Sequence, residues 1–213
     1  EVVRDACSLL ERSVDKKIRI ACRLDAERAT VMGDPAQLAN VLLNMGLNSR
    51  DAMPDGGELI FATANVTIDA DYADRQLERI EPGDYLRIDV TDEGSGMEAG
   101  VQERIFEPFF TTKGPGKGSG LGLAAAFGAV RSHHGTITVY SEPGHGTTLR
   151  VYLPTTTETP VRREPEDGVR AAETDALVLV VEDEPVLREL FEEILKELGY
   201  RCVLKENGER AIE

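Results

Sequence analysis

The chain has 213 residues, of which 41% are hydrophobic, and its formal net charge is −15. With six Phe, five Tyr and no Trp, a buried core must be mainly aliphatic. A chain with this negative charge is a poor general binder of nucleic acid or of anionic membranes, because both need clustered Lys and Arg. No apolar run approaches the roughly 20 residues of a membrane span, and no signal peptide is visible.

The three cysteines, Cys7, Cys22 and Cys202, are odd in number and widely spaced. This spacing favours reduced thiols in a cytosolic protein over a disulfide framework or a zinc site. The chain opens and stops inside periodic patterns, so we expect it to be part of a longer protein.

The first half of the chain predicts two helices and three strands. Residues 1–14 read as the end of a helix, and residues 18–24, 58–69 and 85–92 read as strands. The second helix begins at Asp34 and Pro35, because Asp can cap a helix and Pro suits its first turn. The apolar stripe of this helix faces a core and comprises Leu38, Val41, Leu42, Met45, Ser49 and Ala52.

A Gly-rich irregular region is expected over residues 93–120, followed by a helix of small residues at 121–134. The strands at 136–141 and 147–154 form a hairpin candidate. This order of helices and antiparallel strands predicts an α/β sandwich, with one mixed sheet and helices on one face. We expect residues 1–154 to form this domain.

Residues 155–175 contain Thr, Pro and charged side chains with little to bury, which is typical of a linker. The continuous apolar run at 176–181 is typical of a buried parallel strand. An amphipathic helix and a short strand follow it. Residues 176–213 therefore read as the first βαβ unit of a doubly wound, flavodoxin-like domain that is cut short.

Three asparagines, Asn40, Asn44 and Asn48, recur every four residues on the helix that begins at Pro35. Residues four apart share one helix face. Asparagine is a mediocre helix former, so three asparagines on one helix face need an explanation. A solvated face would explain two isolated asparagines, and only the rest of the chain favours a functional site.

The stretch VTDEGSGM places Asp92 at the end of a strand, beside Gly94 and Gly96. It also fits a G-x-G-x-x-A dinucleotide pattern through Ala99, but no helix and parallel strand follow as that fingerprint requires. A carboxylate beside glycines can instead accept a hydrogen bond from an exocyclic amine such as that of adenine.

The stretch TTKGPGKGSGLGLA carries five glycines together with Lys113 and Lys117. No P-loop register fits it. Glycines let backbone N–H groups approach phosphate oxygens, and helix N-termini favour anions. A flexible linker is the alternative, but a linker would not open directly into a packed helix.

Taken in order, these segments resemble the GHKL (Bergerat-fold) ATP-binding superfamily. NVLLNMGLNSRDAM resembles its N box, VTDEGSGM its first glycine box, IFEPFF its F box and GKGSGLGL its second glycine box. GHGTTLRVYLP resembles the closing strand of the kinase branch. The whole pattern looks most like the catalytic ATP-binding domain of bacterial sensor histidine kinases.

The resemblance implies ATP and Mg²⁺ as cofactors. Asn44 and Asn48 would be catalytic residues within the ATP site, with Asn48 as the Mg²⁺ ligand, and Asp92 would bind the adenine amine. The other residues assigned to the ATP site by the resemblance are Arg50, Gly94, Gly96, Phe106, Phe109, Phe110, Lys113, Lys117, Gly118, Gly120, Leu121, Gly122 and Thr147. Asn40 is expected to be solvated. Ser49, Glu93 and Ser119 depart from the usual residues without removing a ligand.

Position 44 bears on mechanism. The ATP-hydrolysing branches commonly carry a Glu there that activates water, whereas the amide of Asn44 cannot act as a base. This favours phosphoryl transfer, which needs mainly positioning and charge neutralisation. Two alternatives stay open, a GHKL-type ATPase and a non-catalytic nucleotide-binding regulatory module.

The segment VLVVEDEPVLREL resembles the start of a response-regulator receiver domain. Glu182 and Asp183 would be its acidic pair for Mg²⁺, while its phosphoacceptor Asp would lie beyond Glu213. The resemblance as a whole implies a hybrid sensor histidine kinase of a two-component system.

The kinase would phosphorylate a His in a dimerisation domain that precedes this chain, and pass the phosphoryl group to a receiver or a cognate response regulator. His133, His134 and His145 are expected to be structural or on the surface. We expect a cytoplasmic domain without nucleic-acid or direct membrane contact, and whether the parent protein is anchored to the bacterial inner membrane stays open.

Overall fold

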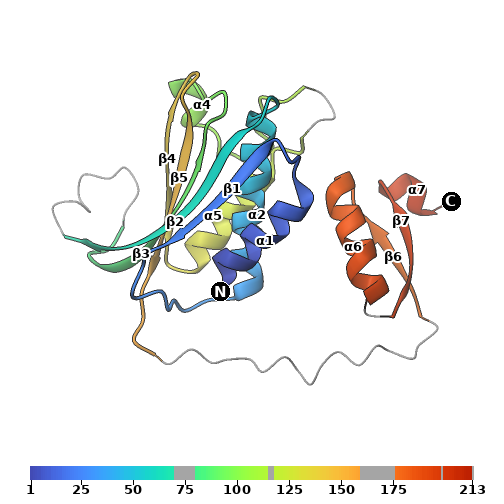
Figure 1. The fold of residues 1–213 in the computed structure, drawn as a ribbon, viewed down its shortest axis with the longest axis horizontal. Coiled ribbons are helices and arrows are strands. Elements are labelled where there is room, and N and C mark those ends of the chain that lie inside the picture. The colour runs from blue at the N-terminus through green and yellow to red at the C-terminus, as the bar shows by residue number, and fades with distance from the viewer. Residues whose placement is uncertain (70–79, 115–117, 159–175, 198, 213) are drawn as a thin grey trace. The chain divides into compact units, whose positions relative to one another are not determined.

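The computed structural model describes residues 1–69, 80–114, 118–158, 176–197 and 199–212. The chain forms two compact units, Glu1–Thr159 and Pro160–Glu213 (Figure 1). Within the described residues no helix is long and apolar enough to cross a membrane.

The first unit is built on a five-stranded sheet in the order β1-β2-β3-β5-β4. Its strands are β1 (Ile18–Leu24), β2 (Gly57–Ile68), β3 (Gly83–Asp92), β4 (Thr136–Glu142) and β5 (Gly146–Pro154). β1 and β2 are parallel, and the other neighbouring pairs are antiparallel. The predicted mixed sheet is therefore confirmed.

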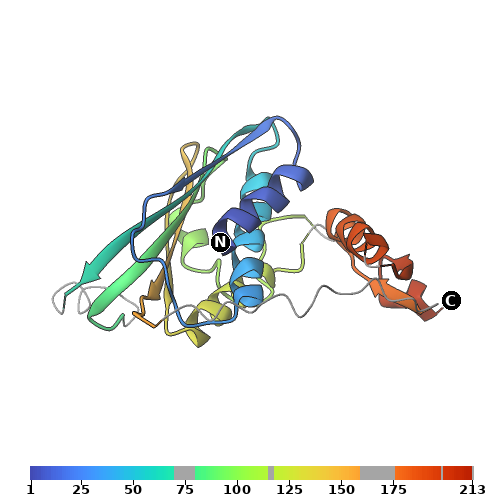
Figure 2. The same ribbon diagram turned by 60° about the horizontal axis from the view of Figure 1, so that its bottom comes forward.

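Helices cover one face of this sheet. α1 (Val2–Ser13), α2 (Pro35–Ala52) and α5 (Gly122–Ser132) lie on the same side of it, and α2 packs against both α1 and α5 (Figures 1 and 2). The predicted α/β sandwich is thus confirmed. A short helix, α4 (Ala99–Gln102), interrupts the region that was expected to be irregular. No side chain caps it, so its start carries no sequence signal.

α2 begins where the sequence predicted. The Asp34 side chain accepts hydrogen bonds from the backbone N–H groups of Ala36 and Gln37, and Pro35 occupies the first turn. His133, at the end of α5, accepts a bond from the Asp34 N–H at Nε2 and lies 2.6 Å from the Ala129 carbonyl oxygen at Nδ1. The neutral ring must then carry its proton on Nδ1. His133 therefore has the structural role expected of it.

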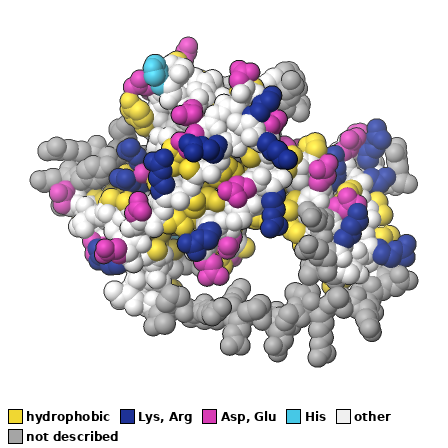
Figure 3. Space-filling model, in the orientation of Figure 1, with side chains coloured by type: hydrophobic (Ala, Val, Ile, Leu, Met, Phe, Trp, Pro, Cys, Tyr) yellow, Lys and Arg dark blue, Asp and Glu magenta, His cyan; other side chains and the backbone are white. Residues whose placement is uncertain are grey.

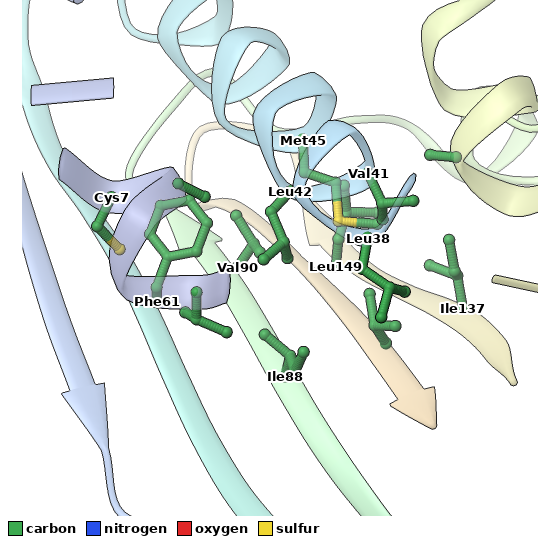
Figure 4. Close-up of a cluster of buried hydrophobic side chains, with 14 of the residues drawn as sticks. Cys7, Leu38, Val41, Leu42, Met45, Phe61, Ile88, Val90, Ile137 and Leu149 are labelled. Atoms are coloured by element: carbon green, nitrogen blue, oxygen red, sulfur yellow. The ribbon is translucent and has the colours of Figure 1, made fainter. Parts of the chain in front are cut away.

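The core lies between α2 and the sheet. Leu42 and Met45 of α2 meet Phe61, Val90 and Leu149 of the strands, and all five are almost fully buried (Figure 4). The predicted apolar stripe of α2 is buried from Leu38 to Ser49, with Gly46 added and Ala52 only half-buried.

α1 completes the core at one side. Leu10 is 1% exposed and its side chain sits over Gly46, where an added Cβ would lie 2.4 Å from Leu10 Cδ1. A glycine at position 46 is thus what lets α1 approach α2 so closely.

The second unit contains β6 (Leu177–Val181), α6 (Pro185–Glu197), β7 (Arg201–Lys205) and α7 (Gly208–Ile212). β6 and β7 are parallel, which fits the predicted βαβ unit. The expectation that β6 is buried on both faces is wrong, because Leu177, Leu179 and Val181 are exposed. Exposed and half-buried side chains alternate along β6, so only one face of this strand is covered. α7 was not predicted.

Charges on the first unit are mixed in sign. On the face seen in Figure 3, Lys and Arg side chains of described residues are interspersed with Asp and Glu. Opposite charges so close together largely cancel at distances beyond about 10 Å. This face therefore offers no broad positive surface among the residues that the structure describes.

Candidate functional site

The site is centred on Asp92, the last residue of β3, which is 5% exposed. Ser49 of α2 donates a hydrogen bond to its Oδ2 at 2.8 Å, and the Gly94 N–H donates to its Oδ1 at 2.9 Å. Burial raises the pKa of Asp92, although the bonds from Ser49, Gly94 and the Thr147 N–H oppose that rise. The carboxylate is held in one orientation and keeps acceptor capacity for a further donor.

The glycine-rich turn after Asp92 passes close to neighbouring backbone. Gly96 has a φ of +65°, and an added Cβ would lie 1.9 Å from the Glu142 carbonyl oxygen. The Ser95 N–H donates to the Ala52 carbonyl at the end of α2. Gly96 is required here both by its φ and by this close approach.

Asn44 and Asn48 project from α2, and both are half-buried, whereas Asn40 is exposed as expected. Asn44 lies at the N-terminus of α5, since an added Cβ at Gly122 would be 3.4 Å from Asn44 Oδ1. Backbone N–H groups at a helix start attract anions. An amide and a helix N-terminus therefore share one side of the site.

A lysine stands against the same helix. Lys113 Nζ is 3.4 Å from Asn48 Oδ1 and forms an ion pair with Asp51. Arg50 also pairs with Asp51, at 2.7 Å. Burial alone would raise the pKa of Asp51, but the hydrogen bonds and charges of Lys113 and Arg50 outweigh it and hold that pKa below its usual value.

Sequence reasoning missed Asp51. Its signal was available, because Asp51 follows Asn48 by three residues and so shares its helix face. Asp51 belongs to neither the asparagine row nor the glycine pattern.

The three phenylalanines differ in environment. Phe106 stacks against Phe127 of α5 with ring centroids 5.0 Å apart, and Phe110 lies under Arg104. Phe109 is 75% exposed and has a positive φ of 67°. Its N–H donates to the Gly120 carbonyl at 3.0 Å, so the two ends of the glycine-rich segment are tied together.

The remaining predicted site residues divide by position. Gly118 lies beside Lys113, and Leu121 is exposed directly before α5. Thr147 pairs with Asp92 in the sheet register and lies 2.9 Å from Ser141 Oγ through its hydroxyl. Lys117 lies outside the described residues.

In the second unit Glu182 and Asp183 follow β6 directly. Glu182 Oε1 accepts a hydrogen bond from the Glu184 N–H at 3.2 Å, and Asp183 is exposed. Among the described residues, no three His, Cys, Asp or Glu side chains cluster as a metal site would require.

The first unit therefore combines a buried acceptor, a helix N-terminus and a lysine around one helix face. The acceptor suits an amine on an aromatic base, and the other two suit phosphate oxygens. Asn48 presents its amide oxygen to a cation, the ammonium group of Lys113. A hard oxygen donor of this kind fits Mg²⁺, which protein sites bind through few side chains together with substrate phosphates.

Comparison with known proteins identifies relatives of this chain. The profile of the histidine kinase-, DNA gyrase B- and HSP90-like ATPase family matches residues 33–157. The sensor kinase CckA of Brucella abortus is 36% identical over 221 aligned residues, covering 100% of this chain and 23% of the relative. The sensor histidine kinase ZraS of Escherichia coli is 39% identical over 124 residues, covering 58% of this chain and 23% of the relative.

Solved structures share the fold. Full-length ShkA in complex with AMPPNP matches 99% of this chain and 40% of its own, with a TM-score of 0.58 and 23% identity. The catalytic domain of the histidine kinase ThkA matches 73% of this chain and 91% of its own, with a TM-score of 0.58 and 25% identity. The chain spans less than a quarter of the length of the curated relatives CckA and ZraS.

Proposed function

Because the chain belongs to the histidine kinase-, DNA gyrase B- and HSP90-like ATPase family, we propose that residues 1–154 are the ATP-binding catalytic domain of a hybrid sensor histidine kinase. The domain would transfer the γ-phosphoryl group of ATP to a histidine of a dimerisation domain elsewhere in the parent protein. We place this activity in the cytoplasm.

One observation carries this proposal, the buried Asp92 carboxylate fixed by Ser49 and the Gly94 N–H at the end of β3. The carboxylate would accept the exocyclic amine of adenine. Gly96 has no Cβ, so the turn after Asp92 can pass close to the Glu142 backbone. The base would therefore be selected by a hydrogen bond to a charged acceptor, the stronger class of such bonds.

The phosphates would lie toward α5. Asn44 faces the helix N-terminus at Gly122, where backbone N–H groups favour phosphate oxygens. Lys113 supplies positive charge beside Asn48. Lys117, Gly118 and Gly120 would complete the cradle, with Arg50 as a further phosphate contact.

Mg²⁺ would be held by Asn48 together with the phosphates, and would supply charge neutralisation on the group being transferred. The family-typical water-activating acid is replaced by Asn44, which cannot remove a proton. Transfer to a histidine is therefore favoured over hydrolysis, and we expect slow release of free phosphate.

We further propose that the second unit is the beginning of a receiver domain, with Glu182 and Asp183 as part of its Mg²⁺ site. Its parallel β6–α6–β7 arrangement is the unit from which doubly wound sheets are made. Phosphate would pass from the histidine to an aspartate of the completed receiver or of a cognate response regulator.

The first test is calorimetric titration of the whole chain with ATP and Mg²⁺. Asp92→Asn keeps the shape of the side chain but removes its charge, and we expect ATP affinity to fall on the order of 10- to 100-fold, since bonds to charged groups contribute about 1.5–3 kcal/mol. Asn48→Ala should remove the Mg²⁺ dependence. Asn40→Ala, on the same helix but exposed, is the matched control and should bind as the unchanged chain does.

The kinase activity needs a second test. The histidine-containing domain is supplied in trans with labelled ATP, and an acid-labile phosphoprotein is expected. Binding of ATP without such a product would favour a nucleotide-binding regulatory module. Rapid multiple-turnover release of phosphate would favour an ATPase instead.

A further inference from the structure

Cys7 and Cys22 meet although 15 positions separate them, and their Sγ atoms are 3.3 Å apart. Cys7 lies on α1 at the margin of the core, next to Phe61 (Figure 4). Cys22 lies on β1, one of the two edge strands of the five-stranded sheet. Both residues precede position 33, where the family profile begins, so the pair lies outside the segment that carries the proposed ATP site.

The two thiols differ in accessibility. Cys7 is 3% exposed, whereas Cys22 is open to solvent. Burial raises the pKa of the Cys7 thiol, and the neighbouring Cys22 thiol and Glu11 carboxylate raise it further. A dissolved oxidant therefore meets Cys22 first, while Cys7 stays protonated and shielded behind it.

We propose that Cys7 and Cys22 form a dithiol site that hydrogen peroxide oxidises to a disulfide, which fastens α1 to the edge strand β1. In the first step the Cys22 sulfur attacks one peroxide oxygen and the O–O bond breaks. Cys22 becomes a sulfenic acid, and the departing hydroxide takes the thiol proton and leaves as water.

In the second step the Cys7 sulfur attacks the Cys22 sulfur and the S–O bond breaks. The departing hydroxide takes the Cys7 proton and leaves as a second water. The two thiols together lose two electrons, and the peroxide is reduced to two waters. Because the sulfur atoms already touch, this step needs only side-chain rotation and a small approach of α1 to β1.

The disulfide would change how α1 is held. In the reduced protein α1 is attached through apolar packing of Val3, Ala6 and Leu10, together with the chain that leads into β1. Cys7 lies in the middle of α1, so a covalent bond there restrains the whole helix against opening from the sheet. Local openings set the rate at which amide hydrogens exchange.

The test uses the whole chain carrying Cys202→Ser, so that the pair holds its only thiols. Protein treated with hydrogen peroxide is blocked with N-ethylmaleimide and digested with trypsin without reductant. We expect peptide 5–12 to be joined to peptide 20–23 in monomeric protein. We also expect amide exchange of α1 to slow, and dithiothreitol to restore the original rate.

Cys22→Ser changes an exposed side chain and is the control, in which peroxide should alter neither Cys7 nor the exchange of α1. Three results would overturn the proposal. These are oxidation of Cys22 beyond the sulfenic acid while Cys7 stays free, a link that forms only in urea or between two chains, and a link that leaves α1 exchange unchanged.

Discussion

Ser49→Ala removes the hydroxyl that donates to the buried Asp92 carboxylate at 2.8 Å. Hydrogen bonds to charged groups contribute about 1.5–3 kcal/mol, and their loss is most costly when the partner is buried. Asp92 keeps its bonds from Gly94 and Thr147, so we expect the free energy of unfolding at neutral pH to fall toward the lower end, about 1.5 kcal/mol.

The loss should depend on pH in a defined direction. Burial already raises the pKa of Asp92 above its ordinary value of 3.8, and removal of the Ser49 donor raises it further. A carboxyl group whose pKa is raised in the folded state binds its proton more readily there than in the unfolded state. Its contribution to the free energy of unfolding therefore falls as the pH rises from the unfolded-state pKa to the folded-state pKa. The difference between variant and parent should therefore shrink as acid protonates Asp92 in both.

The measurement is urea unfolding of the whole chain followed by tyrosine fluorescence. Four of the five tyrosines lie in Glu1–Thr159, so the signal reports mainly the unit that holds Asp92. Ser8→Ala is the matched control, since Ser8 Oγ donates to a backbone carbonyl on the exposed side of α1. Surface changes of this kind stay within about 0.5 kcal/mol.

Two results would refute this reasoning. One is a loss for Ser49→Ala at neutral pH no larger than that for Ser8→Ala. The other is a loss that stays constant or grows as the pH is lowered, because the hydroxyl would then not act through the ionised carboxylate.

Three further predictions concern neighbouring features of the first unit. Gly96→Ala would place a Cβ 1.9 Å from a β4 carbonyl at a φ of +65°, so urea unfolding should show a loss of at least about 1–3 kcal/mol, while Gly100→Ala, with open space around it, should show little. Leu10→Ala should lower the free energy of unfolding by about 2–5 kcal/mol in the same titration, because Leu10 is only 1% exposed and its truncation leaves a cavity in the core. Asp51→Asn should cost less than about 1 kcal/mol but free Lys113 from its ion pair, so limited trypsin digestion should cut faster after Lys113; an unchanged rate would contradict this.

Much of the first unit was predictable because local signals and the fold agree. Asp34 and Pro35 predicted the start of α2, and the spacing of its apolar residues predicted the face that packs on the sheet. The alternation in β1 and β2 and the glycine turn between β4 and β5 gave the strands within a residue or two. The second unit was harder, because the apolar run of β6 reads as buried whether or not anything covers its outer face.

The contacts that join distant segments were not predictable from spacing. Lys113 and Asp51 are 62 positions apart, and the hydrogen bond from Ser49 to Asp92 spans 43. The number and spacing of the cysteines argued against a disulfide framework, and they gave no sign that the sulfur atoms of Cys7 and Cys22 touch. Sequence separation limits through-space distance only along one element, whereas here a helix folds back over the strand that follows it.

Asn48 illustrates how the missing contacts change the reading of a residue that the sequence did single out. The resemblance to the GHKL superfamily implied that its amide oxygen ligates Mg²⁺. In the structure that oxygen faces the ammonium group of Lys113, and Asp51 on the next turn of the same helix face holds the same lysine. Asn48 and Asp51, three residues apart on one helix face, thus both hold the positive charge of Lys113 within an otherwise acidic chain. The cation contact on this helix face is made by Asn48 and Asp51 together, and the row of asparagines alone does not reveal the contribution of Asp51.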